Sequence, residues 1–479
     1  MPDNALSRSI NTIGTQTLPI IFIPGVMGSR LEFTENPKTP WDPDNQVFTM
    51  AFRWLPLKAN DKRNILDFKK EANVNHFPLN TQFFAKNIRL EEIDRNWGEV
   101  VFSKYGPFLH SMDKNRSGTT FGRFKTPVYA LGYDWRQTND KSGDKITDRI
   151  IDDILPKEKA NQAIIITHSM GGLVLRAALN NNSDLIDKVK GVIHVMQPAA
   201  GAPVFYRRFY TGNQIPVDDP GIGILGFPLG FSPLNIILGE SPQAWATMVS
   251  AMRGPTELIP TPRYSDGVNH EWINFFTILG SPVALAVRQQ DFFPYLELGH
   301  PPALVDQLDF INSDPTVIED IAKRVGQAKT FHDKLGLFNH PNTWAIFSTG
   351  VETDTAFFRD QNTNMDFDKA RSLRGDGTVP ETSASILFPS QRHKLGDLCK
   401  GDPRQFEVTG VDHADGMLSA EIQTLIKAIV EKMLGLRCFE PPPAPPSPQP
   451  STSVEEPGTK VFEESTEDHV FHKPKPTSE

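Results

Sequence analysis

The stretch Ile164-Ile-Ile-Thr-His-Ser169-Met-Gly-Gly172 places a serine between a run of strand-forming residues and a helix start made of small residues. Three consecutive isoleucines favour a short buried strand, and Gly171 lets a following helix approach that strand closely. A sharp turn from strand to helix strains the backbone of its central residue and lifts the side chain above the sheet. Ser169 is therefore the predicted nucleophile of a catalytic site.

One position in this stretch departs from the Gly-x-Ser-x-Gly pattern that such turns usually carry, because Thr167 occupies the place of the first glycine. A small β-branched side chain fits there with modest crowding, while the strand and the helix on either side keep their patterns. The alternative interpretation is an ordinary turn that carries no chemistry.

Five other short apolar runs, each bounded by turn residues, predict further buried strands at 18–23, 127–133, 191–196, 344–349 and 406–409. Apolar residues at helical spacing follow Ser169 and recur over 144–155 and 418–433. Short buried strands that alternate with helices predict a mostly parallel sheet with helices on both faces. A serine at a strand-to-helix turn of such a sheet is typical of the α/β-hydrolase fold, which is the predicted fold class.

Two segments interrupt this alternation and predict insertions that form a cap or lid, at about 44–120 and 204–340. The α/β-hydrolase domain accordingly spans 18–436 and follows an extension at 1–17. Residues 221–238 are apolar but broken by Gly and Pro, which suits a mobile lid and a buried irregular connection equally well.

The last part of the chain, 437–479, begins with a proline-rich run and continues with polar and charged residues. Such a composition cannot bury a core and predicts a disordered tail. The tail is either inert or a ligand for a partner domain.

Composition excludes several classes of function. There are 49 Lys and Arg against 58 Asp and Glu, and this balance disfavours binding to nucleic acid. Two cysteines form no disulfide framework, and the ligand spacings of a metal site are absent from the sequence, so no metal and no cofactor is expected. Without an apolar leader or an apolar run of membrane-spanning length, a cytoplasmic protein is the default, with export by a signal-independent route as the alternative.

A serine hydroxyl needs a base and an orienting carboxylate, and on this fold they follow the serine in the order acid, then histidine. Asp376 lies between two glycines after the strand at 344–349, and His413 follows the last strand. These two residues are the predicted partners of Ser169. Asp376 could also be a simple turn residue.

Other acids and histidines fit these roles less well. Asp412 and Asp415 stand too close in sequence to His413 to orient it, and His168 adjoins the serine and cannot easily point back to it. The remaining histidines considered, which lack a matching loop after a strand, are His110, His194 and His300.

The negative oxygen of a tetrahedral intermediate needs hydrogen-bond donors. One is expected to be the backbone N–H of Met170, directly after the nucleophile. The second should come from the loop after the first strand, where Val26 is the preferred donor and Met27 its close rival. A plain glycine turn is the alternative for this loop.

Four ordered motifs resemble the lecithin:cholesterol acyltransferase family, which also includes phospholipid:diacylglycerol acyltransferases, lysosomal phospholipase A2 and bacterial lipases. They are Phe22-Ile-Pro-Gly-Val-Met-Gly-Ser-Arg-Leu31, Gly132-Tyr-Asp-Trp-Arg136, Thr167-His-Ser-Met-Gly-Gly172 and Gly375-Asp-Gly-Thr-Val-Pro380. The resemblance implies a Ser169–Asp376–His413 triad and an oxyanion donor near Val26. It also implies a lipid site under a lid, with Met27 and Trp41 as substrate-binding residues.

The predicted function is hydrolysis of a lipid acyl ester, from a phospholipid or an acylglycerol, through an acyl-Ser169 intermediate, with peripheral contact to a membrane. The first alternative is a lipid acyltransferase that passes the acyl group to an alcohol or sterol. The second is a signal-less secreted antibacterial lipase effector, which would need a neutralising partner. A non-catalytic lipid-binding protein is a further alternative.

Overall fold

The architecture is given by a computed structural model. It describes residues 16–44, 53–54, 56–74, 89–113, 121, 124–212, 241–261, 263–264, 273–275, 314–359, 365–366 and 371–436. The chain divides into two units, 1–440 and 441–479, and all the described residues belong to the first. The candidate lid at 221–238 and the predicted tail at 437–479 lie outside the described residues.

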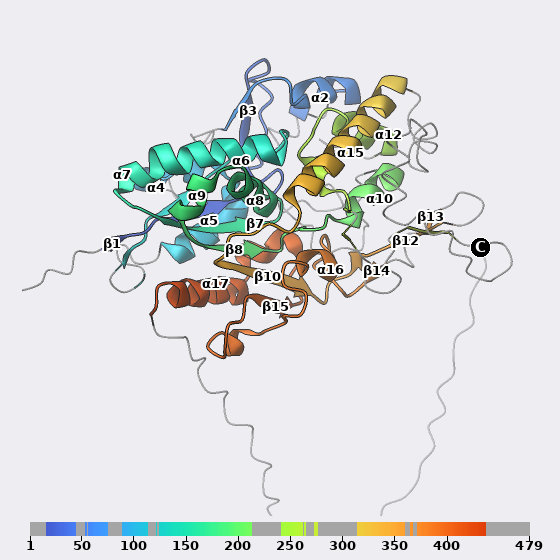
Figure 1. The fold of residues 1–479 in the computed structure, drawn as a ribbon. Coiled ribbons are helices and arrows are strands. Elements are labelled where there is room, and N and C mark those ends of the chain that lie inside the picture. The colour runs from blue at the N-terminus through green and yellow to red at the C-terminus, as the bar shows by residue number, and fades with distance from the viewer. Residues whose placement is uncertain are drawn as a thin grey trace, which may run out of the picture. The chain divides into compact units, whose positions relative to one another are not determined.

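Six parallel strands form the central sheet, in the order β15-β10-β8-β7-β2-β6 (Figure 1). They are β2 (Ile20–Ile23), β6 (Val128–Ala130), β7 (Ala163–His168), β8 (Val189–Val195), β10 (Thr343–Thr349) and β15 (Gln405–Thr409). Each corresponds to one of the six apolar runs in the sequence. The predicted parallel sheet is therefore confirmed.

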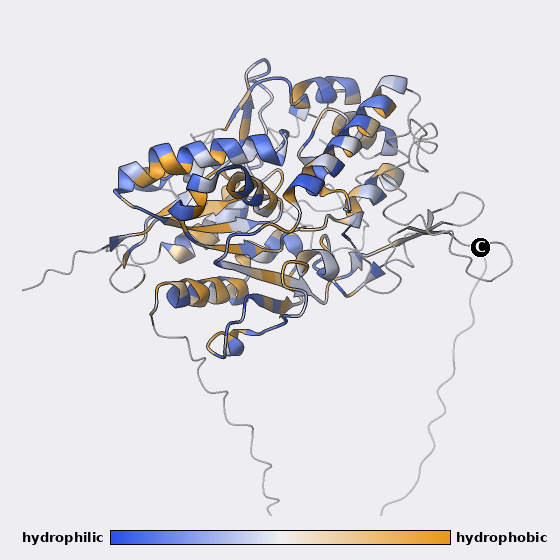
Figure 2. Ribbon diagram, viewed as in Figure 1, coloured by the Kyte–Doolittle hydropathy of each residue, from blue (hydrophilic) through white to orange (hydrophobic). Residues whose placement is uncertain are grey.

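Side chains of β2, β6 and β7 alternate between two hydrophobic cores. In β2, Ile21 and Ile23 belong to the core shared with α6 (Asn139–Asp148) and α8 (Gly171–Asn181). Ile20 and Phe22 belong to the opposite core, shared with helices on the other face. Figure 2 shows apolar strands between helices whose colour alternates along their length, as expected for helices with one face on the sheet.

The helices of that other face are α5 (Phe102–Met112) and α17 (Ala420–Met433). α17 confirms the helix predicted over 418–433, with a 3₁₀ turn, η6 (His413–Leu418), in front of it. The periodic segment 144–155 belongs to a longer helical run. This run begins with α6, whose N-terminus is capped by Thr138. It continues through a π-helical stretch, η2 (Arg149–Ile154), into α7 (Leu155–Glu158).

Part of the predicted first insertion belongs to the hydrolase core. α5 lies inside 44–120, yet Tyr105, Phe108 and Leu109 are buried in the same core as Phe22. The helix was not visible as a periodic pattern because most of its residues are apolar or small, and Pro107 stands within it. Burial on most sides removes the polar stripe that marks a surface helix.

A group of helices near one end of the sheet joins the two predicted insertions (Figure 1). Its members are α2 (Ala59–Leu66), α10 (Pro203–Thr211), α12 (Pro242–Val249), η4 (Pro255–Leu258) and α15 (Pro315–Leu335). α12 contacts α2, α10 and α15, and α15 also contacts α8. This group of helices therefore rests on the helix that starts at the serine turn.

The other described elements are short. They are β1 (Gln16–Thr17), β3 (Leu31–Phe33), β4 (Ala72–Val74), α4 (Leu90–Ile93), η1 (Trp97–Glu99), β5 (Phe124–Lys125), α9 (Ser183–Lys188), β9 (Ile273–Phe275), β11 (Thr353–Asp354), β12 (Phe357–Arg359), β13 (Met365–Asp366), β14 (Arg371–Ser372), α16 (Glu381–Ala384) and η5 (Leu395–Asp397).

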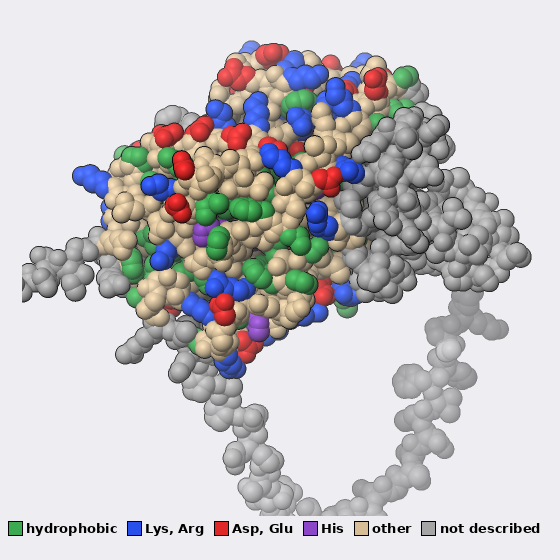
Figure 3. Space-filling model, viewed as in Figure 1, with side chains coloured by type: hydrophobic (Ala, Val, Ile, Leu, Met, Phe, Trp, Pro, Cys, Tyr) green, Lys and Arg blue, Asp and Glu red, His purple; other side chains and the backbone are tan. Residues whose placement is uncertain are grey.

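Charges of both signs are interspersed on the face shown in Figure 3, with apolar side chains between them. Such mixing is typical of a hydrated protein surface. Among the described helices, not one combines the length and the hydropathy needed to cross a membrane.

Gly171 allows the close contact between α8 and β2. A Cβ atom at this position would lie 2.4 Å from the carbonyl oxygen of Pro24 and 2.7 Å from that of Ile23. Both obstacles are backbone atoms, so the helix and the strand would have to separate. We expect Gly171→Ala to lower the free energy of unfolding, measured by urea denaturation, by roughly 1–3 kcal/mol.

Gly326 in α15 is the matched control, because a Cβ there would meet nothing within 4 Å. Gly326→Ala should raise the free energy of unfolding by roughly 0.5–1 kcal/mol, since alanine is the better helix former. Equal stabilities for Gly171→Ala and the wild type would contradict the account of this contact.

Candidate active site

Ser169 occupies the turn between β7 and α8 in a strained conformation. Its φ angle is +52°, in the left-handed region that non-glycine residues seldom adopt. Its backbone N–H donates to the carbonyl of Val195 at the end of β8, and Gly172 N–H donates to Ser169 O. A Cβ on Gly25 would come within 2.9 Å of Ser169 Cβ. Neighbouring glycines therefore make room for the strained serine.

The three residues predicted as a triad form one hydrogen-bonded chain. Ser169 Oγ lies 2.9 Å from His413 Nε2, and His413 Nδ1 lies 2.8 Å from Asp376 Oδ2. The other carboxylate oxygen, Oδ1, accepts from the backbone N–H groups of Thr378 and Val379. Both oxygens of Asp376 are thus used, which fixes the carboxylate plane against the imidazole.

The loop that carries Asp376 needs both of its glycines. A Cβ on Gly375 would lie 2.5 Å from Thr353 Oγ1, and Gly377 has a φ of +89°. Gly377 N–H also donates to Thr353 Oγ1. Close packing therefore requires glycine before Asp376, and the positive φ favours glycine after it.

His413 follows β15 and begins η6. Its backbone N–H donates to the carbonyl of Asp376, which ties the two loops together. The rival carboxylates are engaged elsewhere, because Asp412 accepts from the N–H of Ala414 and Asp415 pairs with Lys104. The structure thus brings Asp376, and neither rival, to His413 Nδ1.

The electrostatics of the site favour a protonated His413. Burial lowers the pKa of this imidazole, whereas the negative charge of Asp376 and its hydrogen bond raise it, and the net pKa lies above the ordinary 6.5. A base of this kind can accept a proton from a serine hydroxyl and return it later.

Val26 and Met27 lie in the turn after β2, and Met170 directly follows Ser169. Met27 has a φ of +60°, and Gly28 N–H donates to Gly25 O across the turn. Within the described residues, the backbone N–H groups of Val26 and Met170 make no hydrogen bond. Both groups are therefore available to a negatively charged oxygen, which suits the predicted oxyanion donors.

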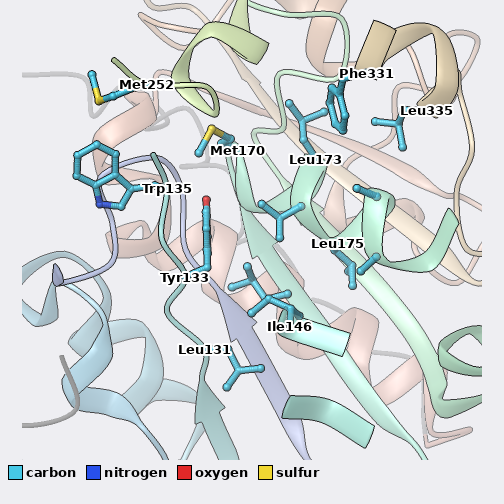
Figure 4. Close-up of a cluster of buried hydrophobic side chains, with 14 of the residues drawn as sticks. Leu131, Tyr133, Trp135, Ile146, Met170, Leu173, Leu175, Met252, Phe331 and Leu335 are labelled. Atoms are coloured by element: carbon cyan, nitrogen blue, oxygen red, sulfur yellow. The ribbon is translucent and has the colours of Figure 1, made fainter. Parts of the chain in front are cut away.

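The Gly132–Arg136 motif holds the loop that contains Val26. Tyr133 Oη donates to the carbonyl of Pro24, and Tyr133 N–H donates to Ser29 Oγ. Trp135 Nε1 donates to the carbonyl of Ser29. Figure 4 shows Tyr133, Trp135 and Met170 in one cluster of buried side chains. The motif thus supports the loop from inside the protein.

The end of the loop is held by a buried ion pair. Arg30 forms two 2.8 Å hydrogen bonds with Asp42, and neither side chain is exposed by more than 2%. Asp44, two residues on, accepts from the first backbone N–H groups of α5. The segment around Trp41 therefore connects the loop to a core helix.

Trp41, predicted to bind substrate, is only 1% exposed. Its ring packs edge-on against Trp135 at 5.3 Å, and its Nε1 donates to the carbonyl of Met27. In this structure the buried indole holds the backbone of Met27 through this hydrogen bond, and it does not line an open surface. Met27 itself is half-buried against the same core.

Thr167, the departure from the glycine pattern, has a partner across the sheet. Its Oγ1 lies 2.8 Å from Nδ1 of His194, which is its register partner in β8. Burial lowers the pKa of His194 to about 3, so the imidazole is neutral and can share this hydrogen bond. The threonine therefore forms an interaction that glycine could not.

Tyr105 and His168 also belong to the site, although the sequence did not identify them as such. Tyr105 Oη lies 3.2 Å from His168 Nδ1, and His168 Nε2 lies 3.1 Å from the carbonyl oxygen of His413. Tyr105 lies in α5, within the segment 44–120 that the sequence predicts to be an insertion. His168 adjoins the serine in sequence, and its hydrogen bonds go to Tyr105 and to the backbone of His413.

Comparison with known proteins agrees with the motifs. The model of the family described as "Lecithin:cholesterol acyltransferase" matches residues 109–218, which include Ser169. The chain has the α/β-hydrolase fold and resembles this family.

Two similar proteins add to this picture. "Uncharacterized protein YJR098C" of Saccharomyces cerevisiae is 32% identical over 147 residues, and the match covers 30% of this chain and 20% of that protein. The chain thus spans about a fifth of the length of that relative. The structure described as "The crystal structure of Tle4-Tli4 complex" aligns with a TM-score of 0.64 at 19% identity, over 88% of this chain and 99% of that one. This likeness shows a shared fold.

The raised pKa of His413 predicts the pH dependence of any reaction that uses it as a base. The imidazole must be neutral to accept a proton, so kcat/KM should rise with pH and reach half its maximum above pH 6.5. In Asp376→Asn the favourable charge is lost while burial remains, so the midpoint should move to lower pH. Rates of ester cleavage measured across pH 5–9 test this.

Asp412→Asn provides the control. Asparagine can still accept from Ala414 N–H, while the negative charge of Asp412, which raises the pKa of His413 less than Asp376 does, is removed. Its midpoint should move less than that of Asp376→Asn. Identical midpoints in the wild type and Asp376→Asn would contradict the proposed source of the pKa shift.

Proposed function

We propose that this α/β-hydrolase cleaves acyl esters of lipids through a covalent acyl-Ser169 intermediate. The observation that carries the proposal is the hydrogen-bonded chain from Ser169 Oγ through His413 to Asp376. This arrangement supplies a nucleophile, a base and an orienting carboxylate in hydrogen-bond reach of one another.

In the first half-reaction, Ser169 Oγ attacks the ester carbonyl carbon while its proton moves to His413 Nε2. The N–H groups of Val26 and Met170 bind the negative oxygen of the tetrahedral intermediate. Collapse of the intermediate breaks the ester bond, and the leaving alcohol takes the proton from His413. Water then attacks the acyl carbon of acyl-Ser169 and loses a proton to the same nitrogen. As the bond from the acyl carbon to Ser169 Oγ breaks, His413 returns this proton to Oγ, which releases the fatty acid and restores the serine hydroxyl.

A lipid is the proposed substrate class, a phospholipid or an acylglycerol. The match to the lecithin:cholesterol acyltransferase family supports this choice. The helices α2, α10, α12 and α15 pack as one group on α8, the helix that starts at Ser169, and we assign to this group the role of covering the acyl chain. Hydrolysis is preferred to transfer because water needs no binding pocket of its own, whereas an alcohol or sterol acceptor does.

A second candidate function is that of a secreted lipase effector restrained by a protein partner. The shared fold with the protein named in the Tle4-Tli4 complex, over 88% of this chain, favours it. The chemistry at Ser169 would be the same in both functions. They differ in where the lipid lies and in whether a partner covers the site.

Ser169→Ala should lower the release of fatty acid from phospholipid vesicles by about 10³-fold or more, because the nucleophile is removed. Ser111→Ala is the control, since it removes a buried serine hydroxyl on α5 that has no hydrogen-bond partner in the described structure. That variant should keep wild-type activity. Mass spectrometry of the products gives the measurement.

Adding an alcohol or sterol to the same assay separates hydrolysis from transfer. Free fatty acid as the main product supports the hydrolase, and a new ester supports the transferase. Fatty-acid release by Ser169→Ala at the wild-type rate would rule out the proposed nucleophile.

A further inference from the structure

A second chain of hydrogen bonds runs beside the triad. It begins at the backbone N–H of Gly25, which donates to Tyr105 Oη at 3.3 Å. It continues from Tyr105 to His168 Nδ1 and from His168 Nε2 to the carbonyl of His413, at 3.2 and 3.1 Å. The chain therefore connects the loop of the predicted oxyanion donor to the residue that carries the base.

The direction of each hydrogen bond follows from the groups involved. The carbonyl of His413 can only accept, so His168 Nε2 must carry the proton and donate. Nδ1 of a neutral imidazole then accepts, and Tyr105 Oη donates to it while accepting from Gly25 N–H. One set of proton positions satisfies all three bonds.

The protonation states agree with that arrangement. Burial lowers the pKa of His168 to about 3, with the nearby His413 acting in the same direction. Burial raises the pKa of Tyr105 to about 12. Both residues are therefore uncharged at neutral pH, as the directions of the bonds require.

Packing leaves little freedom for this chain to adjust. Tyr105 and His168 are 7% and 5% exposed, and the His168 and His413 rings lie 5.0 Å apart. A Cβ on Gly28 would lie 2.8 Å from Tyr105 Oη, so the hydroxyl touches both ends of the loop turn. The Lys104–Asp415 ion pair joins α5 to η6 next to the chain.

We infer that Tyr105 and His168 are positioning residues that set the distance between the oxyanion loop and His413. The inference rests on the proposed function, because it concerns the same serine chemistry. His168 holds the backbone of His413, and Tyr105 holds both His168 and Gly25. A base and an oxyanion donor that approach the same carbonyl from different loops need a fixed spacing, and small displacements in such sites lower rates strongly.

The test uses Tyr105→Phe, His168→Leu and His168→Gln in the full chain. Leucine keeps an apolar volume but removes the donor, whereas the amide nitrogen of glutamine can replace Nε2 toward the carbonyl of His413. Tyr129→Phe is the matched control, because it removes a buried tyrosine hydroxyl that donates to Glu158. Two rates are measured, the labelling of Ser169 by a fluorophosphonate and the turnover of a short soluble ester.

The expected result is a loss in kcat with KM changed less than about twofold. His168→Leu should slow labelling and turnover by about 10- to 100-fold, and Tyr105→Phe by about 5-fold. His168→Gln should recover most of the loss. The double variant Tyr105→Phe with His168→Leu should be slower than His168→Leu alone by less than the loss seen for Tyr105→Phe alone, because the connection from Tyr105 to His413 is already broken.

Thermal melting of each variant separates positioning from stability. Tyr129→Phe should lose thermal stability much as Tyr105→Phe does, yet label at the wild-type rate. If His168→Leu does not fold, Tyr105→Phe and His168→Gln still decide the question. Labelling of the variants at the wild-type rate, or no gain from glutamine over leucine, would overturn the positioning role alone. A wild-type protein that is not labelled at Ser169 would overturn the proposed function as well.

Discussion

The left-handed conformation of Ser169 is the constraint on which the rest of the site depends. It turns the chain from β7 into α8 and lets the hydroxyl meet His413. Strain of this kind persists only where the surroundings fix the backbone. Here the carbonyl of Val195 accepts from the serine N–H, and Gly25 and Gly171 bring the β2 loop against the turn. Glycines from two separate motifs thus allow the close packing around Ser169.

The loop after β2 is held from several directions because its backbone is expected to act on substrate. Aromatic side chains from the Gly132–Arg136 motif and Trp41 supply hydrogen bonds from the core side, and the Arg30–Asp42 pair holds its end. On the other face, Tyr105 contacts Gly25. A backbone N–H group stabilises a transient negative charge more strongly when it is already held in place, because it then needs no reorganisation during the reaction.

The sequence predicted the sheet, and the meeting of Asp376 and His413 with Ser169, for a physical reason. Strands buried on both faces are nearly continuous apolar runs, so all six were recognisable, and chain order on this fold placed Asp376 and His413. What it missed lies in contacts between segments that are distant in sequence. Tyr105 stands in a helix without a polar stripe, and the bond between Thr167 and His194 depends on strand register. The substrate role predicted for Trp41 came from family resemblance, which does not reveal that its indole is buried under Met27.

The central claim is that Ser169 becomes acylated, with His413 and Asp376 assisting. The most direct measurement is rapid-quench analysis of an ester with a chromogenic alcohol, combined with mass spectrometry of the quenched protein. We expect a burst of alcohol equal to the enzyme concentration and an acyl group on the peptide that contains Ser169. Turnover without a covalent intermediate under conditions where deacylation is slow, or an acyl group on another residue, would contradict it.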